Sequence, residues 1–413
     1  MKRALSMSRR VVVTGVGMVT PLGVGKNIFS QKLFKGNSGI CPITSFDTSR
    51  FPSRLGAQVF DFSPADFISR KNLRKMDRLS RMAAASARMA IDDSGVNMDF
   101  INMDRMGIIL GTAYGSTDVS VQFAGILFDE GPRMVSPSLV PNSVMNAPAG
   151  HTSIELKFRG INSTVNHHEA SAETAIAYAA AEIIRGSADI MLTGGTEIIS
   201  EFFFEILSKF RALSPLNEGP EEARPFDTMR NGFVVGEGSG ILCLEDIEHA
   251  EARGATPYCE IVGWGMSAYP SPPTDWPSDP KGPALAMTRA LESAGIGPDE
   301  IDYICASANG GRKLDILEAE ALSSVFTTKG KRPFVSSIKG AVGESFSSGG
   351  IRAAAMAISI KEKVIPLTLG LKSPIKPLQF VLNKNKDTQI NFGMVNGFSS
   401  GGTFVSIIFR GLC

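Results

Sequence analysis

Short apolar runs alternate with longer segments of mixed polarity along this chain, and glycine or proline commonly separates them. We expect β-strands at the apolar runs and helices between them. This alternation predicts an α/β fold with a mostly parallel sheet covered by helices. The expected strands are residues 10–17, 106–110, 190–192, 240–244, 258–265, 303–306, 334–337, 389–392 and 403–409. The expected helices are residues 77–94, 171–185, 282–294, 315–326 and 350–361.

Two segments with the same kind of opening divide the chain into halves. The first begins Arg10-VVVTGVG and the second Tyr258-CEIVGWG, and each is a strand that runs into glycine. A chain of 413 residues is long enough for two to three domain-sized units. The repeated opening fits a duplicated unit, so we expect an N-terminal half at residues 1–256 and a C-terminal half at residues 257–413.

Composition excludes several classes of function. The net charge of +1 gives no electrostatic support for nucleic-acid binding. No apolar run reaches about 18 residues, so we expect no transmembrane helix. The basic N-terminus lacks the apolar core of a secretory signal. The cysteines lack CxxC pairs, which predicts reduced thiols in a cytoplasmic protein with no metal site and no cofactor. They are Cys41, Cys243, Cys259, Cys305 and Cys413, and we expect Cys243 and Cys305 to be packing residues.

The segment Gly160-INSTVNHHEASAETAIAYAAAEIIRG places Glu169 at a chemically informative position. A strand-like approach at residues 163–165 enters a sharp turn, and a helix follows at residues 171–185. The N-terminus of such a helix offers free N–H groups and a partial positive charge. That field lowers the pKa of a thiol, so this is where an α/β enzyme exposes a nucleophile. Here the position is held by Glu169.

The whole chain resembles the β-ketoacyl synthases of the thiolase superfamily, and the elbow segment carries much of that resemblance. The resemblance implies a five-layered fold of two αβαβα halves packed back to back. It also implies a Cys-His-His triad, in which the cysteine accepts the acyl chain. The matching positions are Glu169, then Ser307 in the segment Tyr303-ICASANGGRKLD, then Glu344 in Val335-SSIKGAVGESFSSGG.

These substitutions remove the chemistry of condensation. A carboxylate that attacked a thioester would form a mixed anhydride, which is uphill and quickly hydrolysed. An anionic Glu344 would repel a developing enolate, and loss of one oxyanion donor costs about 100- to 1000-fold in rate. The family's charged residues beneath the triad are retained as Lys339, Asp315 and Glu318. Its gating phenylalanine and asparagine are replaced by Ser400 and Phe404.

Within the family, the chain is most similar to the chain-length factors, the ketosynthase β subunits of type II polyketide synthases. They usually carry glutamine in place of the cysteine, whereas this chain carries glutamate. The resemblance implies two partners: an active ketosynthase in a heterodimer, and an acyl carrier protein that delivers malonyl units. It also implies a shared tunnel that sets product length. Residues at matching positions are Tyr114, Thr117 and Val121, expected on one helix face, and Leu139 in a loop that crosses to the partner.

Several alternatives stay open from the sequence. Three roles for Glu169 are open. It fills a vacated site, it acts as an acid or base with His167 or His168, or it contacts a loop of the partner. The chain as a whole is a partner subunit, a malonyl-carrier-protein decarboxylase, a condensing enzyme with a rebuilt site, or a structural pseudoenzyme. The alternative for the tunnel positions is that they are simply buried in the hydrophobic core. Phe202, Phe203 and Phe204 would make subunit contacts or pack beneath a loop.

Overall fold

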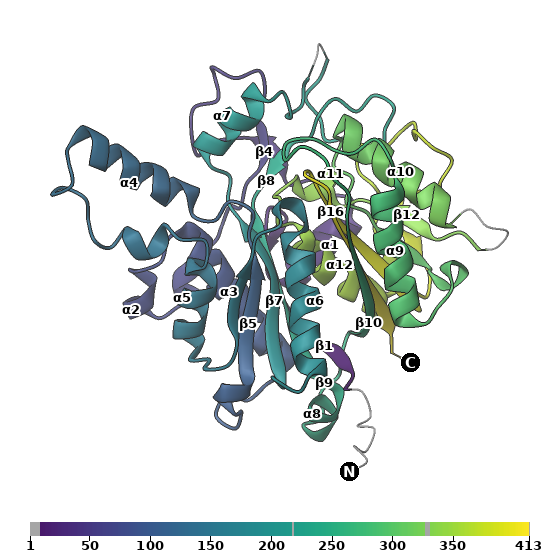
Figure 1. Ribbon diagram of the computed structural model, residues 1–413, viewed down its shortest axis with the longest axis horizontal. Helices are drawn as coiled ribbons and strands as arrows, with labels where there is room; N and C mark the ends of the chain where they lie inside the picture. The colour runs from purple at the N-terminus through teal and green to yellow at the C-terminus, as the bar shows by residue number, and fades with distance from the viewer. Residues whose placement is uncertain (1–8, 217–218, 327–330, 413) are drawn as a thin grey trace.

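The computed structural model describes residues 9–216, 219–326 and 331–412, and a large mixed sheet runs through its centre (Figure 1). The strand order is β12-β11-β15-β16-β10-β1-β9-β7-β5-β6, and β2 pairs with β1. Two small sheets lie beside it, β3-β4-β8 and β13-β14. The bounds of the main strands are β1 Val11–Thr20, β2 Gly23–Val24, β5 Met106–Gly111, β6 Asn162–Val165, β7 Ile190–Glu197, β9 Gly238–Asp246, β10 Cys259–Ala268, β11 Tyr303–Cys305, β12 Phe334–Ser336, β15 Phe392–Ser399 and β16 Thr403–Gly411.

The remaining elements are helices and the short strands of the small sheets. The short strands are β3 Ile40–Pro42, β4 Leu55–Ala57, β8 Val235–Gly236, β13 Val364–Ile365 and β14 Lys386–Asp387. The helices are α1 Lys26–Phe34, α2 Arg70–Leu73, α3 Arg78–Ser94, α4 Thr117–Asp129, α5 Ala147–Leu156, α6 Ser171–Ile184, α7 Glu201–Lys209, α8 Ile247–Ala252, α9 Lys281–Ala294, α10 Arg312–Phe326, α11 Lys339–Val342 and α12 Gly349–Glu362. Short 3-10 turns are η1 Pro64–Asp66, η2 Met103–Arg105, η3 Val140–Asn142, η4 His168–Ala170 and η5 Pro298–Glu300.

The strand order repeats between the two halves of the chain. Reading outward, the first half has β1-β9-β7-β5-β6 and the second has β10-β16-β15-β11-β12, with the same succession of two antiparallel and two parallel pairings. Even the register shift in the innermost strand recurs, after Val13 in β1 and after Ile261 in β10. The boundary between residues 256 and 257 stays a prediction.

Helices complete a five-layered arrangement, as expected for a thiolase-like fold. α6 and α12 lie in the middle layer, where they pack against each other and against strands from both halves. α3 and α5 cover the outer side of the first half, and α9 and α10 cover that of the second (Figure 1). The middle helices are rich in alanine and mostly buried, because sheets enclose them on both sides, although Tyr178 and Ile184 of α6 are exposed.

Two expectations about the strands are wrong. The sheet is mixed rather than mostly parallel, because its central strands meet in antiparallel pairs and β15 and β16 are joined by a tight turn at residues 400–402. The strand expected at residues 389–392 begins only at Phe392 and runs to Ser399. Asp302 ties down the preceding backbone, since its Oδ2 accepts the N–H groups of Asn391 and Phe392. The glycine-rich segment 393–404 is thus mostly strand.

Candidate functional site

The turn before α6 brings Glu169 into the interior. β6 ends at Val165, and His168 then adopts a left-handed conformation with φ of 47°, which reverses the chain direction before η4 and α6. The Ser171 hydroxyl fixes this turn because it accepts the His167 N–H and donates to the His168 carbonyl. Glu169 is only 6% exposed at the helix N-terminus. The sharp turn expected from the sequence is therefore present.

The Glu169 carboxylate is bound by the turn between β15 and β16. The Ser400 backbone N–H donates to Oε2 at 3.2 Å, and the Ser399 hydroxyl donates to the same oxygen at 3.0 Å. The Ser400 hydroxyl lies within 3.3 Å of both carboxylate oxygens. An acyl-transfer site would need such N–H donors free to polarise a carbonyl. Here a side chain of the protein itself occupies them.

Electrostatics favour proton uptake by Glu169. Burial raises the pKa of its carboxyl, and the charge of nearby Glu344 raises it further. His168 Nδ1 lies 4.0 Å from Glu169 Oε2, too far for a hydrogen bond. The His167 ring instead meets the Thr174 hydroxyl at 3.2 Å, and burial lowers its pKa. The acid–base pairing expected as one alternative thus has no hydrogen bond from either histidine to Glu169 among the described residues.

Glu344 is held as an anion in a closed polar cluster. Lys339 Nζ lies 2.5 Å from Glu344 Oε2, and Asn309 Nδ2 donates to the same oxygen at 2.8 Å. The Phe346 N–H donates to the other oxygen at 2.9 Å. Burial alone would raise the pKa of Glu344, but the Lys339 charge and these hydrogen bonds more than offset it and hold the pKa below its usual value.

The structure brings Asn309, rather than Ser307, to this cluster. The Ser307 hydroxyl accepts the backbone N–H of Phe398, so it faces β15. Asn309 lies two residues further along the same loop, and its side chain contacts Glu344. Sequence reasoning missed Asn309. The available signal was its place directly before Gly310 and Gly311, where a polar side chain at a sharp turn is exposed to a facing segment.

Asp315 and Glu318 position that loop through its backbone. Glu318 accepts hydrogen bonds from the backbone N–H groups of Ser307 and Ala308. It also accepts one from Asn396 Nδ2 at 3.0 Å. Asp315 accepts the N–H of Asn309 at 3.0 Å and that of Phe226 at 2.7 Å. Burial raises the pKa of Asp315 to about 7 and also raises that of Glu318. These carboxylates, like Lys339, hold the backbone and the buried cluster of the site in place.

A second buried ion pair, between Glu173 of α6 and Arg352 of α12, was also missed. Both side chains are fully buried and hydrogen-bonded to each other in the middle layer. Each is the only buried charge of an alanine-rich helix and lies within its apolar part, which was a signal that the two would need each other. The pair lies between the two halves and ties the elbow helix to α12.

The expected tunnel residues lie in two different settings. Tyr114 precedes α4 and is not on its face, because Glu197 Oε2 accepts the N–H groups of Ala113 and Tyr114 and holds that turn against β7. Thr117 and Val121 lie on α4 one turn apart, and Val121 is 43% exposed. Leu139 is partly buried in the loop that follows. Figure 1 shows α4 and this loop projecting from the body of the molecule.

The three successive phenylalanines of α7 have three different environments. Phe204 is buried between Phe46 and Phe51. Phe203 stacks on Tyr114, with ring centroids 3.5 Å apart, and Phe202 is 48% exposed. Ser400 lies in the turn at Glu169, whereas Phe404 is buried against Phe398 in the second half. Cys243 and Cys305 are buried packing residues as expected, and Cys413 lies outside the described residues.

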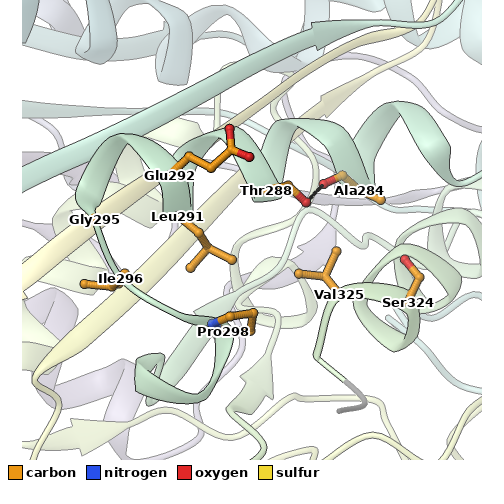
Figure 2. A pocket seen from close by; sticks show the side chains of 9 residues that line it. All are labelled: Ala284, Thr288, Leu291, Glu292, Gly295, Ile296, Pro298, Ser324 and Val325. Carbon is orange, nitrogen blue, oxygen red and sulfur yellow. Dashed lines mark hydrogen bonds between the residues drawn. The ribbon is translucent and has the colours of Figure 1, made fainter.

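Free space at the site is small, and the larger cavities are elsewhere. The void that Glu344 lines together with Tyr114, Phe203 and Phe346 measures about 20 Å³, enough for a single water molecule. A cavity of about 570 Å³ opens between α9 and α10 (Figure 2), and none of its lining residues belongs to the site. Trp276 lines a third cavity, of about 870 Å³, together with Arg230 and Lys313.

Comparison with known proteins identifies the family. Residues 8–250 match the β-ketoacyl synthase N-terminal domain, and residues 258–372 match the β-ketoacyl synthase C-terminal domain. This chain belongs to the β-ketoacyl synthase family. Ketosynthase relatives include the 3-oxoacyl-[acyl-carrier-protein] synthase 2 of Coxiella burnetii, 36% identical over 400 residues, which are 96% of this chain and 97% of the relative. That of a Synechocystis species is 35% identical over 407 residues, 97% of this chain and 98% of the relative.

Solved ketosynthases have the same fold. The ishigamide ketosynthase/chain length factor matches with a TM-score of 0.91 and 30% identity, over 98% of this chain and all of the other. A β-ketoacyl synthase from Burkholderia phymatum gives 0.91 and 31% with the same coverage. The relatives found by sequence that are named above are synthases, whereas a ketosynthase/chain length factor is among the structural neighbours. None of the helices that the structure describes is long and apolar enough to cross a membrane.

Proposed function

We propose that this chain is the non-catalytic subunit of a ketosynthase pair, a chain-length factor that shapes the tunnel shared with an active ketosynthase in type II polyketide synthesis. The active subunit would carry the nucleophilic cysteine, and an acyl carrier protein would deliver malonyl units to it. This chain would contribute the wall of the tunnel and no step of the bond-forming chemistry. The proposal predicts that the isolated chain neither accepts an acyl group nor condenses one.

The binding of Glu169 by Ser399 and Ser400 carries this proposal. A condensing site needs a nucleophile that forms a thioester and donors for a developing oxyanion. At the elbow, the nucleophile position holds a carboxylate, and that carboxylate takes the Ser400 N–H. At the facing positions, Ser307 and the anionic Glu344 stand where the resemblance implies imidazole groups. Ser307 accepts the Phe398 N–H, and Glu344 is bound by Asn309. Both carboxylates are hydrogen-bonded by groups of this chain itself, which supports a scaffold role.

An apolar face around α4 supports a tightly bound partner. Side chains on α4, its following loop, α5 and α6 leave large apolar groups in solvent, and together they adjoin β6, the terminal strand of the sheet within the described residues. Exposed apolar residues gathered on one face are typical of protein–protein interaction sites. The residues are Val121, Phe128, Met134, Val140, Val144, Met145, Ile154 and Tyr178. The partner we assign to this face is a ketosynthase subunit, and the name of one structural neighbour, the ishigamide ketosynthase/chain length factor, supports this choice.

Co-expression with an active ketosynthase and a carrier protein tests the proposal. The complex would be purified through a tag on this chain, loaded with malonyl groups, and analysed by mass spectrometry. We expect an equimolar complex that makes one product length, with acyl adducts only on the cysteine of the ketosynthase. Acylation of this chain, or failure to bind any ketosynthase, would contradict the assignment.

The alternative function is a decarboxylase or a condensing enzyme with a rebuilt Glu169 site. The raised pKa of Glu169 favours it, since a carboxyl that keeps its proton to higher pH can act as a general acid. It requires carbon dioxide release from malonyl-carrier protein by the pure chain and loss of that release in Glu169→Ala. The absence of release from pure, folded protein would eliminate it.

A further inference from the structure

The cavity of about 870 Å³ lies along α10 (Figure 1), and neither Glu169 nor Glu344 lines it. One wall is a face of α10 that includes Ile316. The other walls are Arg230, which follows the buried segment 225–227, and Trp276, in the proline-rich loop after β10. Cavities of roughly 300–1,000 Å³ are typical of sites for small molecules. The cavity is therefore large enough for a ligand of its own.

Arg230 presents a fixed positive charge to this cavity. Its two terminal nitrogens donate to the backbone carbonyls of Asp227 and Arg312, each at 3.0 Å. These acceptors are neutral, the Arg230 Nε has no hydrogen-bond partner, and no carboxylate in the described part of the chain forms an ion pair with it. Burial lowers the pKa of Arg230 despite the attraction of Asp315 and Asp227. Its charge is thus held in place but poorly compensated.

The two carboxylates of the cavity wall already have cations of their own. Asp275 Oδ1 lies 2.5 Å from Lys313 Nζ, and Glu320 Oε1 lies 3.7 Å from Lys376 Nζ. Neither carboxylate neutralises Arg230. An anion that entered the cavity would therefore find a guanidinium that can bind a carboxylate through two N–H groups.

Trp276 gives the cavity a flat apolar wall. It is partly buried and packs against the hydrophobic core of the second half. On α10, Leu317 is buried and Ile316 is 43% exposed, and both line the same cavity. Apolar walls with a few placed polar groups are the usual composition of a small-molecule site, in which the polar groups orient the ligand.

We infer that this cavity binds a small aromatic carboxylate, with its carboxylate on Arg230 and its ring against Trp276. A doubly charged phosphate fits less well, because Asp275 and Glu320 would repel its second charge. The site is independent of the proposed function, since it uses none of the residues that bind Glu169 or Glu344 and needs no partner subunit.

Calorimetric titration of the pure wild-type chain with 2-naphthoate tests the inference. Two further probes separate charge from shape: 2-naphthamide has the same rings without the charge, and acetate has the charge without the rings. We expect saturable binding of naphthoate, at least about tenfold tighter than that of either control, because a hydrogen-bonded charge contributes more than a neutral group. Absent binding of naphthoate, or equal binding of naphthamide, would overturn the inference.

Substitutions locate the binding site. Arg230→Gln should weaken naphthoate binding at least about tenfold. Arg289→Gln is the matched control, since Arg289 is exposed on α9, also donates to a backbone carbonyl, that of Met266 at 2.6 Å, and does not line the cavity. Trp276→Leu should weaken binding roughly two- to tenfold, because ring stacking is lost.

Unchanged naphthoate affinity in folded Arg230→Gln would overturn the assignment. Should Arg230→Gln fail to fold, Trp276→Leu decides, and unchanged affinity there would overturn it equally. The titrations use the chain alone, so a failure to bind any ketosynthase would contradict the proposed function and leave the result for this cavity intact.

Discussion

Lys339 Nζ lies 2.5 Å from Glu344 Oε2, and each side chain is only 1% exposed. Asn309 donates to the same carboxylate oxygen, so the Glu344 position is part of one buried, hydrogen-bonded ion pair. Removal of one partner from such a pair leaves an uncompensated charge in the interior, whereas replacement of both by apolar groups is often nearly neutral. Removal of one charge from this cluster should therefore lower the free energy of unfolding.

Substitution Lys339→Met should lower the free energy of unfolding by about 3–5 kcal/mol, because it leaves the Glu344 anion buried and unpaired. Urea denaturation followed by circular dichroism measures the change. The double variant Lys339→Met/Glu344→Leu is the control, and we expect it to recover most of the loss. Equal losses in the single and double variants would mean that the two charges do not stabilise one another.

Substitution Glu169→Ala should loosen the turn between β15 and β16, since the Ser400 N–H and the Ser399 hydroxyl lose their acceptor. Loss of a hydrogen bond costs about 0.5–1.5 kcal/mol, so amide exchange at Ser400 should speed up roughly two- to tenfold. Hydrogen exchange with mass spectrometry measures this. Glu169→Gln keeps an acceptor oxygen and should exchange nearly as slowly as wild type. Slow exchange in Glu169→Ala would show that the carboxylate does not hold the turn.

The sequence was sufficient for the α/β class and for the place of the site, but not for the antiparallel pairs at the centre of the sheet. Alternating strands and helices predict an α/β fold, and two strand-to-glycine openings reveal the repeat that the strand order confirms. The elbow before α6 was evident because a strand, a turn and an alanine-rich helix follow one another without a gap. Glu169 could be placed there without any knowledge of what binds it.

Side-chain direction within loops could not be predicted in the same way. Whether Ser307 or Asn309 contacts Glu344 depends on how Glu318 and Asp315 grip the loop backbone, and both carboxylates come from a helix further along the chain. The strand β15 was obscured for a related reason. Its glycines lower strand propensity, yet Gly397 is required because a Cβ there would lie 2.4 Å from the Glu173 carboxyl carbon. Such non-local contacts leave no trace in a local pattern.

Stability should fall as pH rises towards 8, and Glu197 is one cause. Burial raises the pKa of Glu197 to about 8, well above its ordinary value of 4.5. Between these two values the folded protein retains a proton that the unfolded chain has lost, so the free energy of unfolding decreases by at most about 1.4 kcal/mol per pH unit. The contribution is fully favourable below about pH 4.5 and is lost by about pH 8. Denaturant titrations from pH 5 to 8.5 should give a flatter profile for Glu197→Gln than for wild type. Parallel profiles would contradict a protonated Glu197.

Substitution Gly397→Ala should destabilise the fold strongly, because the added methyl group meets the buried Glu173 of the Glu173–Arg352 pair. We expect a loss of about 1–3 kcal/mol from this overpacking, measured by thermal unfolding. Gly125→Ala is the matched control: Gly125 lies within α4, and nothing is within 4 Å of the site of its added Cβ. That change should stabilise α4 by roughly 0.5–1 kcal/mol. Equal effects would show that the close approach at Gly397 is relaxed in solution.

The apolar face at α4 should be required for assembly with a ketosynthase. Phe128 at the end of α4 is 84% exposed, and Phe100, in the segment between α3 and η2, is 85% exposed, so the two offer matched sites for the same substitution. Phe128→Glu places a charge in the interface and should weaken the complex at least about tenfold, since burial of an unpaired charge costs several kcal/mol.

Phe100→Glu lies outside the apolar face defined around α4 and should leave affinity unchanged. Size-exclusion chromatography with light scattering, followed by titration of the tagged chain with its ketosynthase, distinguishes the two. Equal affinity of both variants would remove α4 from the interface. Weakening by Phe128→Glu alone would fix the orientation of the partner over α4 and β6.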